Sequence, residues 1–209
     1  MKRQTTLRII GALIAFLVIS LVVFLVIKVT SRPEEDKPAE IVELDSIPKY
    51  GYVLEDRDTP LYKDTFDQLR EVLTNEEVNF DEYAKLLAEL YIIDLYTIDN
   101  KMNQYDVGGI DFVLEKAKEN YELKVKDTLY KYIEDDTYGK RSQKLPKVSS
   151  ISSSEIEKTT VKLENKNYEG YKVPVTWEYV EDMDYDTSAT ITLIKIDEKL
   201  YITNQSASD

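Results

Sequence analysis

The chain has 209 residues, and its 40 acidic side chains outnumber its 27 basic ones, which gives a formal net charge of −13 at pH 7. It contains neither cysteine nor histidine, which excludes disulfides, thiolate chemistry and cysteine-based zinc sites and removes the commonest general base. Few catalytic options remain, so we predict no enzymatic activity and no cofactor.

The negative charge is concentrated after the first 32 residues. Residues 1–32 hold five basic side chains and no acidic one, which leaves 22 basic and 40 acidic side chains, a net charge of −18, on the rest of the chain. Such a surface repels phosphate groups and attracts cations or basic proteins. We therefore predict no nucleic-acid partner.

An apolar run from Ile9 to Ile27 follows a short basic segment. As a helix, its nineteen residues would span about 28 Å, which matches a bilayer hydrocarbon core of about 30 Å. Lys2, Arg3 and Arg8 precede the run with no acid among them, which favours a cytoplasmic N-terminus. We therefore predict a cytoplasmic segment at 1–8, a transmembrane helix over the run, and an extracytoplasmic domain after it.

The run favours a retained anchor over a cleaved signal peptide. The apolar core of a signal peptide usually has about 7–15 residues and ends at a small-x-small site. This run is longer, and the nearest such site, at 29–31, lies between Lys28 and Arg32. The lysine-, asparagine- and tyrosine-rich composition favours the cell membrane of a bacterium.

The exported part divides into a linker and one domain. Residues 28–49 contain proline and many charges without an apolar period, which predicts a juxtamembrane stalk. A domain is predicted over 50–205, with a helical half at 50–139 and a sheet half at 148–205. A short tail at 206–209 ends the chain.

Apolar residues at steps of three and four predict three helices in the first half. The first covers Pro60–Leu73, with Thr59 as N-cap and a proline in the first turn. The second begins after Asn79 as N-cap and ends near Asp99. The third and longest is expected over 106–139.

Alternating apolar residues predict strands in the second half. They are expected at Val161–Leu163, 171–179, Thr187–Ile196 and Leu200–Thr203. Pro174 lacks an amide donor, so its strand is expected to lie at a sheet edge or to be bulged there. The fold predicted is α+β, with about three helices packed on a curved antiparallel sheet of about four strands.

The order of these elements suggests a family. A membrane anchor, a helical first half and a closing hairpin, Ile194-Lys-Ile-Asp-Glu-Lys-Leu-Tyr-Ile, resemble extracytoplasmic domains of the nuclear transport factor 2-like superfamily, with its cystatin-like, cone-shaped fold. Membrane-anchored assembly subunits of type IV secretion and conjugation systems are similar in outline. The resemblance covers 50–205 and implies an enzyme, a ligand carrier or a scaffold, with no catalytic motif to carry over.

Four aromatic residues are the best candidates for a binding surface. They are Tyr168, Tyr171, Trp177 and Tyr179. The last three follow the alternation of the predicted strand 171–179, and Tyr168 comes shortly before it. Aromatic rings of this kind suit recognition of a peptide or glycan, and they also suit ordinary packing. We expect them to line the concave side of the sheet, either as a pocket or partner surface or as the core.

A short acidic segment is the one candidate for a metal site. Asp182, Asp184 and Asp186 have the spacing of the first ligands of an EF-hand loop. Thr187 stands where that loop needs glycine, and Leu193 stands where it needs a bidentate glutamate. We therefore expect a solvated acidic turn and no tight calcium site.

These observations favour a single-pass, membrane-anchored extracytoplasmic domain that binds or scaffolds another envelope protein with a basic surface. A small-ligand carrier or hydrolase that uses the cavity of the cone is one alternative. A calcium-dependent surface module is another. If Trp177 lines an open cavity, the small-ligand carrier is favoured, and if it is fully packed, the protein-binding domain is favoured.

Overall fold

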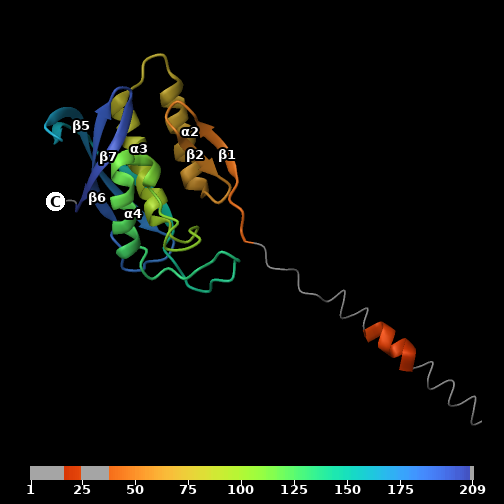
Figure 1. Cartoon of the computed structure of the whole chain (residues 1–209). Helices are drawn as coiled ribbons and strands as arrows, with labels where there is room; N and C mark the ends of the chain where they lie inside the picture. The colour runs from red at the N-terminus through yellow and green to blue at the C-terminus, as the bar shows by residue number, and fades with distance from the viewer. Residues whose placement is uncertain (1–16, 25–37, 208–209) are drawn as a thin grey trace, which may run out of the picture. The chain divides into compact units, whose positions relative to one another are not determined.

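The computed structural model describes residues 17–24 and 38–207, and the segment Ala39–Asp209 forms one compact unit (Figure 1). Residues 17–24 are helical, while the other residues of the predicted span, 9–16 and 25–27, lie outside the described residues. Within the described part of the chain, no helix is both long and apolar enough to cross a membrane.

Two helices begin at the predicted caps. α2 covers Pro60–Thr74, and the Thr59 hydroxyl accepts the N–H of Tyr62 at 3.2 Å. α3 covers Phe80–Tyr96, where the Asn79 side chain accepts N–H groups of the first turn. Such side chains satisfy amides that have no partner within the helix.

The prediction of one long third helix over 106–139 is wrong. The structure has two short 3₁₀ turns, Ile110–Phe112 and Glu115–Ala117, and then α4 at Lys118–Asp127. The chain cannot continue as a helix because Val113 is extended, with φ −96° and ψ 161°, and forms a parallel bridge to Ile202. The longest described helix is α3, with 17 residues.

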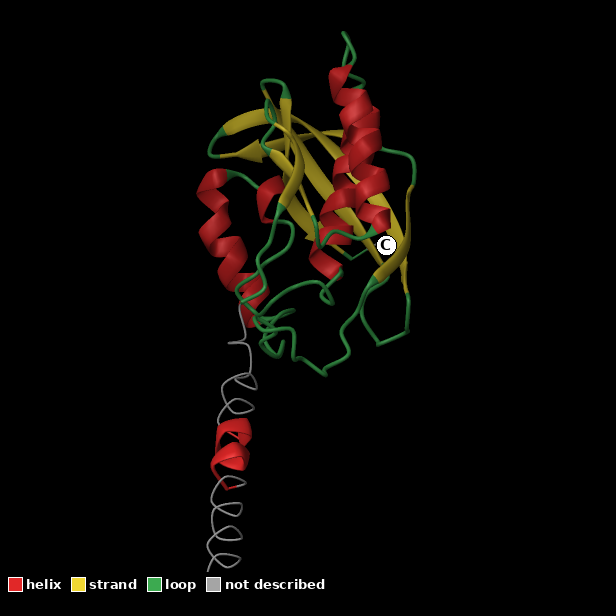
Figure 2. Ribbon diagram, turned by 90° about the vertical axis from the view of Figure 1, so that its right-hand side faces the viewer, coloured by secondary structure: helices red, strands yellow, loops and turns green. Residues whose placement is uncertain are grey.

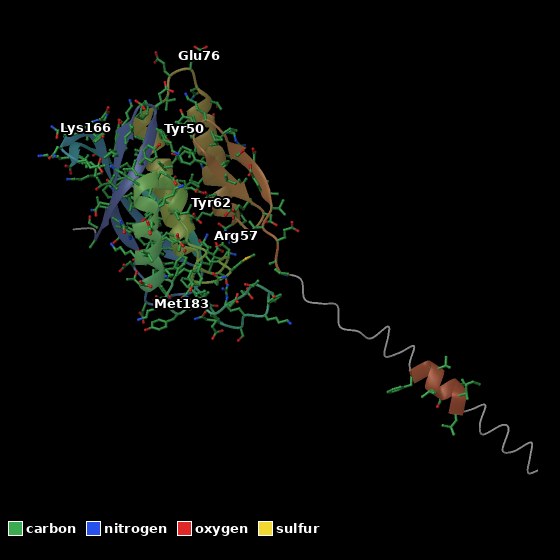
Figure 3. The ribbon with its side chains drawn as sticks, viewed as in Figure 1. Tyr50, Arg57, Tyr62, Glu76, Lys166 and Met183 are labelled. Carbon is green, nitrogen blue, oxygen red and sulfur yellow. The ribbon has the colours of Figure 1, made fainter. Side chains whose placement is uncertain are left out.

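A two-stranded ribbon precedes the helices. β1, Glu43–Ile47, pairs antiparallel with β2, Tyr52–Glu55. The stretch predicted as a stalk, 28–49, therefore contains a strand of the folded unit. Tyr50 between the strands and Tyr62 of α2 are 3% and 6% exposed, and Figure 3 shows both between the ribbon and the rest of the domain.

Five antiparallel strands form the large sheet. They are β3 (Val148–Ser153), β4 (Glu157–Leu163), β5 (Lys166–Tyr179), β6 (Ser188–Ile196) and β7 (Lys199–Ser206). Their order is β3-β5-β6-β7, with β4 also pairing with β5. The predicted α+β class with antiparallel strands is confirmed, and β3 is a strand that the alternation did not predict.

The expectation that the strand of Pro174 lies at a sheet edge or is bulged there is wrong, because β5 pairs on both sides and its register with β6 is continuous through Pro174. β6 lies along one side, while β3 and β4 share the other. The Pro174 carbonyl accepts the N–H of Ser154 at 2.9 Å, where the chain passes from β3 to β4. Pro174, which has no backbone N–H, thus lies opposite the gap between β3 and β4, where no neighbouring strand needs a hydrogen bond from it.

The core lies between the large sheet and the first helices. α3 contacts α2 on one side and β3, β5, β6 and β7 on the other, and Figure 2 shows helices lying across one face of the sheet. Eleven of the 17 residues of α3 are buried. A helix that is apolar nearly all round belongs inside a domain, and here it packs between α2 and the large sheet.

Candidate functional site

Two of the four predicted aromatic residues are core residues. Trp177 is 2% exposed, and its ring centroid lies 4.9 Å from that of Tyr96 in α3. Tyr171 is 1% exposed and donates its hydroxyl to Glu169 at 2.5 Å. Burial and the neighbouring Glu169 carboxylate both raise the pKa of Tyr171. Both rings are packed in the core, although Trp177 also borders the open groove described below.

The other two lie at opposite ends of β5. Tyr168 is opposite Val161 in the β4–β5 hairpin, whose tip at Lys166 is labelled in Figure 3. Tyr179 is half-buried and donates to the carbonyl of Asp186 at 2.8 Å. Ten residues of strand lie between the two tyrosines, so they are roughly 35 Å apart along the chain. The four residues therefore do not form one site.

An open groove of about 690 Å³ lies at the end of the sheet where Tyr179 is found. Its polar side chains include Ser150, Ser152, Thr176, Glu178, Asp182 and Ser188. Several already pair with one another: Ser150 donates to Glu178 at 3.0 Å, and the hydroxyls of Ser152 and Thr176 lie 3.0 Å apart. This composition suits a polar or cationic group of a ligand.

The three predicted calcium ligands do not converge. The Asp184 N–H donates to the Asp182 carboxylate at 3.2 Å, and Asp184 has a left-handed backbone with φ +58°. The Asp186 carbonyl accepts the hydroxyl of Tyr179 at 2.8 Å. Among the described residues, no group of three or more acidic side chains is placed to hold a metal ion. The segment is a turn in which the Asp182 side chain accepts a backbone N–H two residues on.

Sequence reasoning missed a buried ionic cluster around Asp94 of α3. The Lys101 side chain is 3% exposed and its ammonium contacts the Asp94 carboxylate at 2.5 Å. The other carboxylate oxygen accepts the N–H of Gly109 at 2.6 Å. A Cβ on Gly108 would lie 2.2 Å from the Asp94 carbonyl, so this loop requires glycine to approach the helix.

A second ion pair joins the same loop to the start of α2. The Arg57 guanidinium binds both carboxylate oxygens of Asp106, which also accepts the N–H of Met102 at 2.8 Å. Burial opposes ionisation of Asp106, but Arg57 outweighs it and holds the pKa of that carboxyl below its usual value. Arg141 donates to the carbonyls of Lys101 and Asp99, both at 2.7 Å.

These ionic contacts are structural. Each buried charge has a partner, and the groups connect the loops that follow α3 to the start of α2 and to the segment around Arg141. One signal in the sequence could have indicated the cluster: Asp94 is the single acid in the apolar stretch Tyr-Ile-Ile-Asp-Leu-Tyr of a helix. A lone carboxylate there needs a buried partner.

Asp58, beside this cluster, is expected to make stability depend on pH. Burial raises the pKa of its carboxyl to about 6, although its hydrogen bond from the Glu55 N–H acts in the opposite direction. In the unfolded chain the value is about 3.9. Between about pH 4 and 6 the folded state therefore binds a proton that the unfolded state has released, so the contribution of this carboxyl to stability falls as pH rises through that window.

We expect Asp58→Asn to remove this decline. In urea unfolding of residues 39–209, we compare the free energy of unfolding of the variant with that of the wild type at each pH. The variant should be more stable relative to the wild type at pH 7.5 than it is at pH 4. Asp64→Asn, on the exposed side of α2, is the matched control and should show no such gain. An Asp58→Asn effect of equal size at both pH values would contradict the assignment.

Comparison with protein-family models, curated proteins and solved structures finds no match for this chain. The resemblance to nuclear transport factor 2-like domains stays a prediction. The groove, the core and the ionic cluster are therefore interpreted from their own geometry.

Proposed function

We propose that the chain is a single-pass membrane protein whose acidic extracytoplasmic domain binds another protein of the cell envelope. The apolar run Ile9–Ile27 and the basic residues before it support the anchor and its orientation. The compact unit that begins at Ala39 supports a domain held near the membrane by a short linker.

The packing of the concave face is the observation that carries this proposal. A small-ligand carrier or hydrolase of the cone type needs an open cavity there, lined by convergent polar groups. In this domain α3 occupies that face, and Trp177 and Tyr171 pack in the core. This arrangement favours recognition through the outer surface over enclosure of a small molecule.

The charge of the outer surface favours a basic partner. Asp64, Asp67 and Glu71 are exposed along one side of α2, and Glu76 lies at the turn after it, where Figure 3 labels it. An acidic surface speeds encounter with a basic protein and opposes binding to acidic ones. The polar groove near Glu178 adds carboxylates at another place on the domain.

Topology and partner are tested separately. Protease added to intact protoplasts should remove a C-terminal epitope and leave a small membrane-bound stub. A freely secreted product would contradict a retained anchor.

Pull-downs of the full chain from solubilised membranes should recover an envelope protein that is lost as ionic strength rises beyond about 0.15 M, where the screening length falls to about 8 Å. A calcium chelator added in parallel should change nothing. Recovery of a small molecule without any protein would instead favour the carrier, and calcium-dependent recovery would favour the calcium module.

A further inference from the structure

The outer edge of β1 is an unpaired sheet edge with exposed apolar side chains. β1 pairs with β2 on one side, and no other described strand pairs with it (Figure 1). Ile41, Val42 and Leu44 are 37%, 50% and 54% exposed. Free edges of this kind recruit further strands, because their backbone N–H and C=O groups lack partners, and proteins usually cover or blunt them.

Carboxylates are interleaved with these apolar side chains. Glu43 and Asp45 flank Leu44, and all three are exposed. Arg70 of α2 binds Asp45 at 2.6 Å and Asp67 at 3.0 Å, so the acidic side of α2 adjoins the strand. Glu43 makes no ion pair with any described residue. The register of β1 shifts between Glu43 and Asp45, and the Ser46 N–H already donates to the Asp45 carboxylate at 2.7 Å. The edge therefore presents part of a backbone ladder, two apolar side chains and the uncompensated charge of Glu43.

The charges select among possible occupants. In an antiparallel pairing of two copies of β1, Glu43 and Asp45 would face the same acids of the second chain, and like charges directly opposite one another destabilise a sheet. A strand that carries lysine or arginine would place opposite charges there. A third strand would also stabilise the ribbon, since two-stranded hairpins alone are marginal.

We infer that the free edge of β1 accepts an extended basic segment of the envelope protein, which adds as a third strand to the β1–β2 ribbon. This inference rests on the proposed function and specifies how the partner binds. Backbone hydrogen bonds along the edge would supply affinity, Val42 and Leu44 would contact alternate side chains, and Glu43 would select basic residues.

The test uses the full chain in lipid nanodiscs and a labelled seven-residue peptide of alternating lysine and valine. A second peptide has the same charge, with proline in place of two valines, so that it cannot donate the ladder hydrogen bonds. Fluorescence anisotropy should show the alternating peptide binding at least about tenfold more tightly. Hydrogen exchange should show amides at 43–47 becoming protected when it binds.

Matched variants separate the edge from general charge attraction. Glu43→Lys should weaken binding of the alternating peptide by about tenfold. Glu155→Lys makes the same change of charge at an exposed position between β3 and β4 and should leave binding unchanged. Leu44→Ala should weaken binding, whereas Val180→Ala, at a side chain 62% exposed, should not.

Several results would overturn the inference. Equal affinity of the two peptides, or equal losses in Glu43→Lys and Glu155→Lys, would mean that net charge alone attracts the peptide. Protection of 43–47 without peptide would assign the edge to a second copy if it rises with protein concentration, and to the membrane if it rises with anionic lipid.

Partner recovery distinguishes this inference from the proposed function. If an envelope protein co-purifies equally with the wild type and with Glu43→Lys, the edge is not its binding site and the proposed function stands. If the peptide adds to β1 but no envelope protein is recovered at low or high salt, the proposed function fails while the edge remains a strand acceptor.

Discussion

Trp177→Ala is expected to lower the free energy of unfolding of residues 39–209 by about 3–5 kcal/mol, the usual cost of truncating a large buried aromatic side chain. The indole is 2% exposed and packs on Tyr96 where β5 meets α3. Its removal would leave a cavity between the sheet and the central helix. Because this is the only tryptophan, urea unfolding should be followed by circular dichroism and not by fluorescence.

Two further variants show whether the effect comes from burial. Trp177→Phe keeps an aromatic ring against Tyr96 and should cost clearly less than the alanine variant. Tyr132→Ala truncates a side chain that is 77% exposed and should stay within about 0.5 kcal/mol of the wild type. Unchanged unfolding of Trp177→Ala would place the indole at the surface and make it a binding-site candidate again.

Local signals predicted the elements whose ends are fixed locally. Thr59 and Asn79 cap α2 and α3 through their own side chains, so the sequence alone could locate both helix starts. The buried alternation from Tyr171 to Trp177 likewise predicted one face of β5. In each case the residues that decide the structure lie within a few positions of one another.

The third helix was mispredicted because its apolar spacing has other causes. Val113 points toward the core from an extended segment, held by its bridge to Ile202 in β7. Tyr130 is fully buried beyond the end of α4 and donates its hydroxyl to the carbonyl of Leu95 at 2.7 Å. Residues at helical spacing were thus buried by contacts distant in sequence, which periodicity cannot reveal.

β1 was missed for a similar reason. Three of its five residues are exposed and two are charged, and a strand forms there because β2 returns beside it after the turn at Gly51, which has φ +69°. Composition alone made this stretch look like a linker. Of the candidate site, the sequence located the aromatic strand and the acidic turn, but it could not show that Trp177 is packed or that the acids diverge.

The second large effect is expected at the buried pair of Asp94 and Lys101. Asp94→Leu leaves an ammonium group without its partner on a side chain that is 3% exposed, and it also removes the acceptor of the Gly109 N–H. Unpairing a buried charge typically costs about 3–5 kcal/mol. Urea unfolding of residues 39–209 at pH 7 should therefore show a loss of this size.

The double variant Asp94→Leu/Lys101→Met should recover the part of that loss that comes from the unpaired ammonium, because it replaces both charges with apolar side chains of similar volume. The Gly109 N–H stays without its acceptor in the double variant, so that part of the loss remains. Glu181→Gln is the exposed control: its pair with Lys144 has side chains 59% and 74% exposed, and its loss should cost less than about 1 kcal/mol. If the effects of Asp94→Leu and Lys101→Met simply add in the double variant, the two groups are not energetically coupled, and the ion pair does not hold this loop against α3.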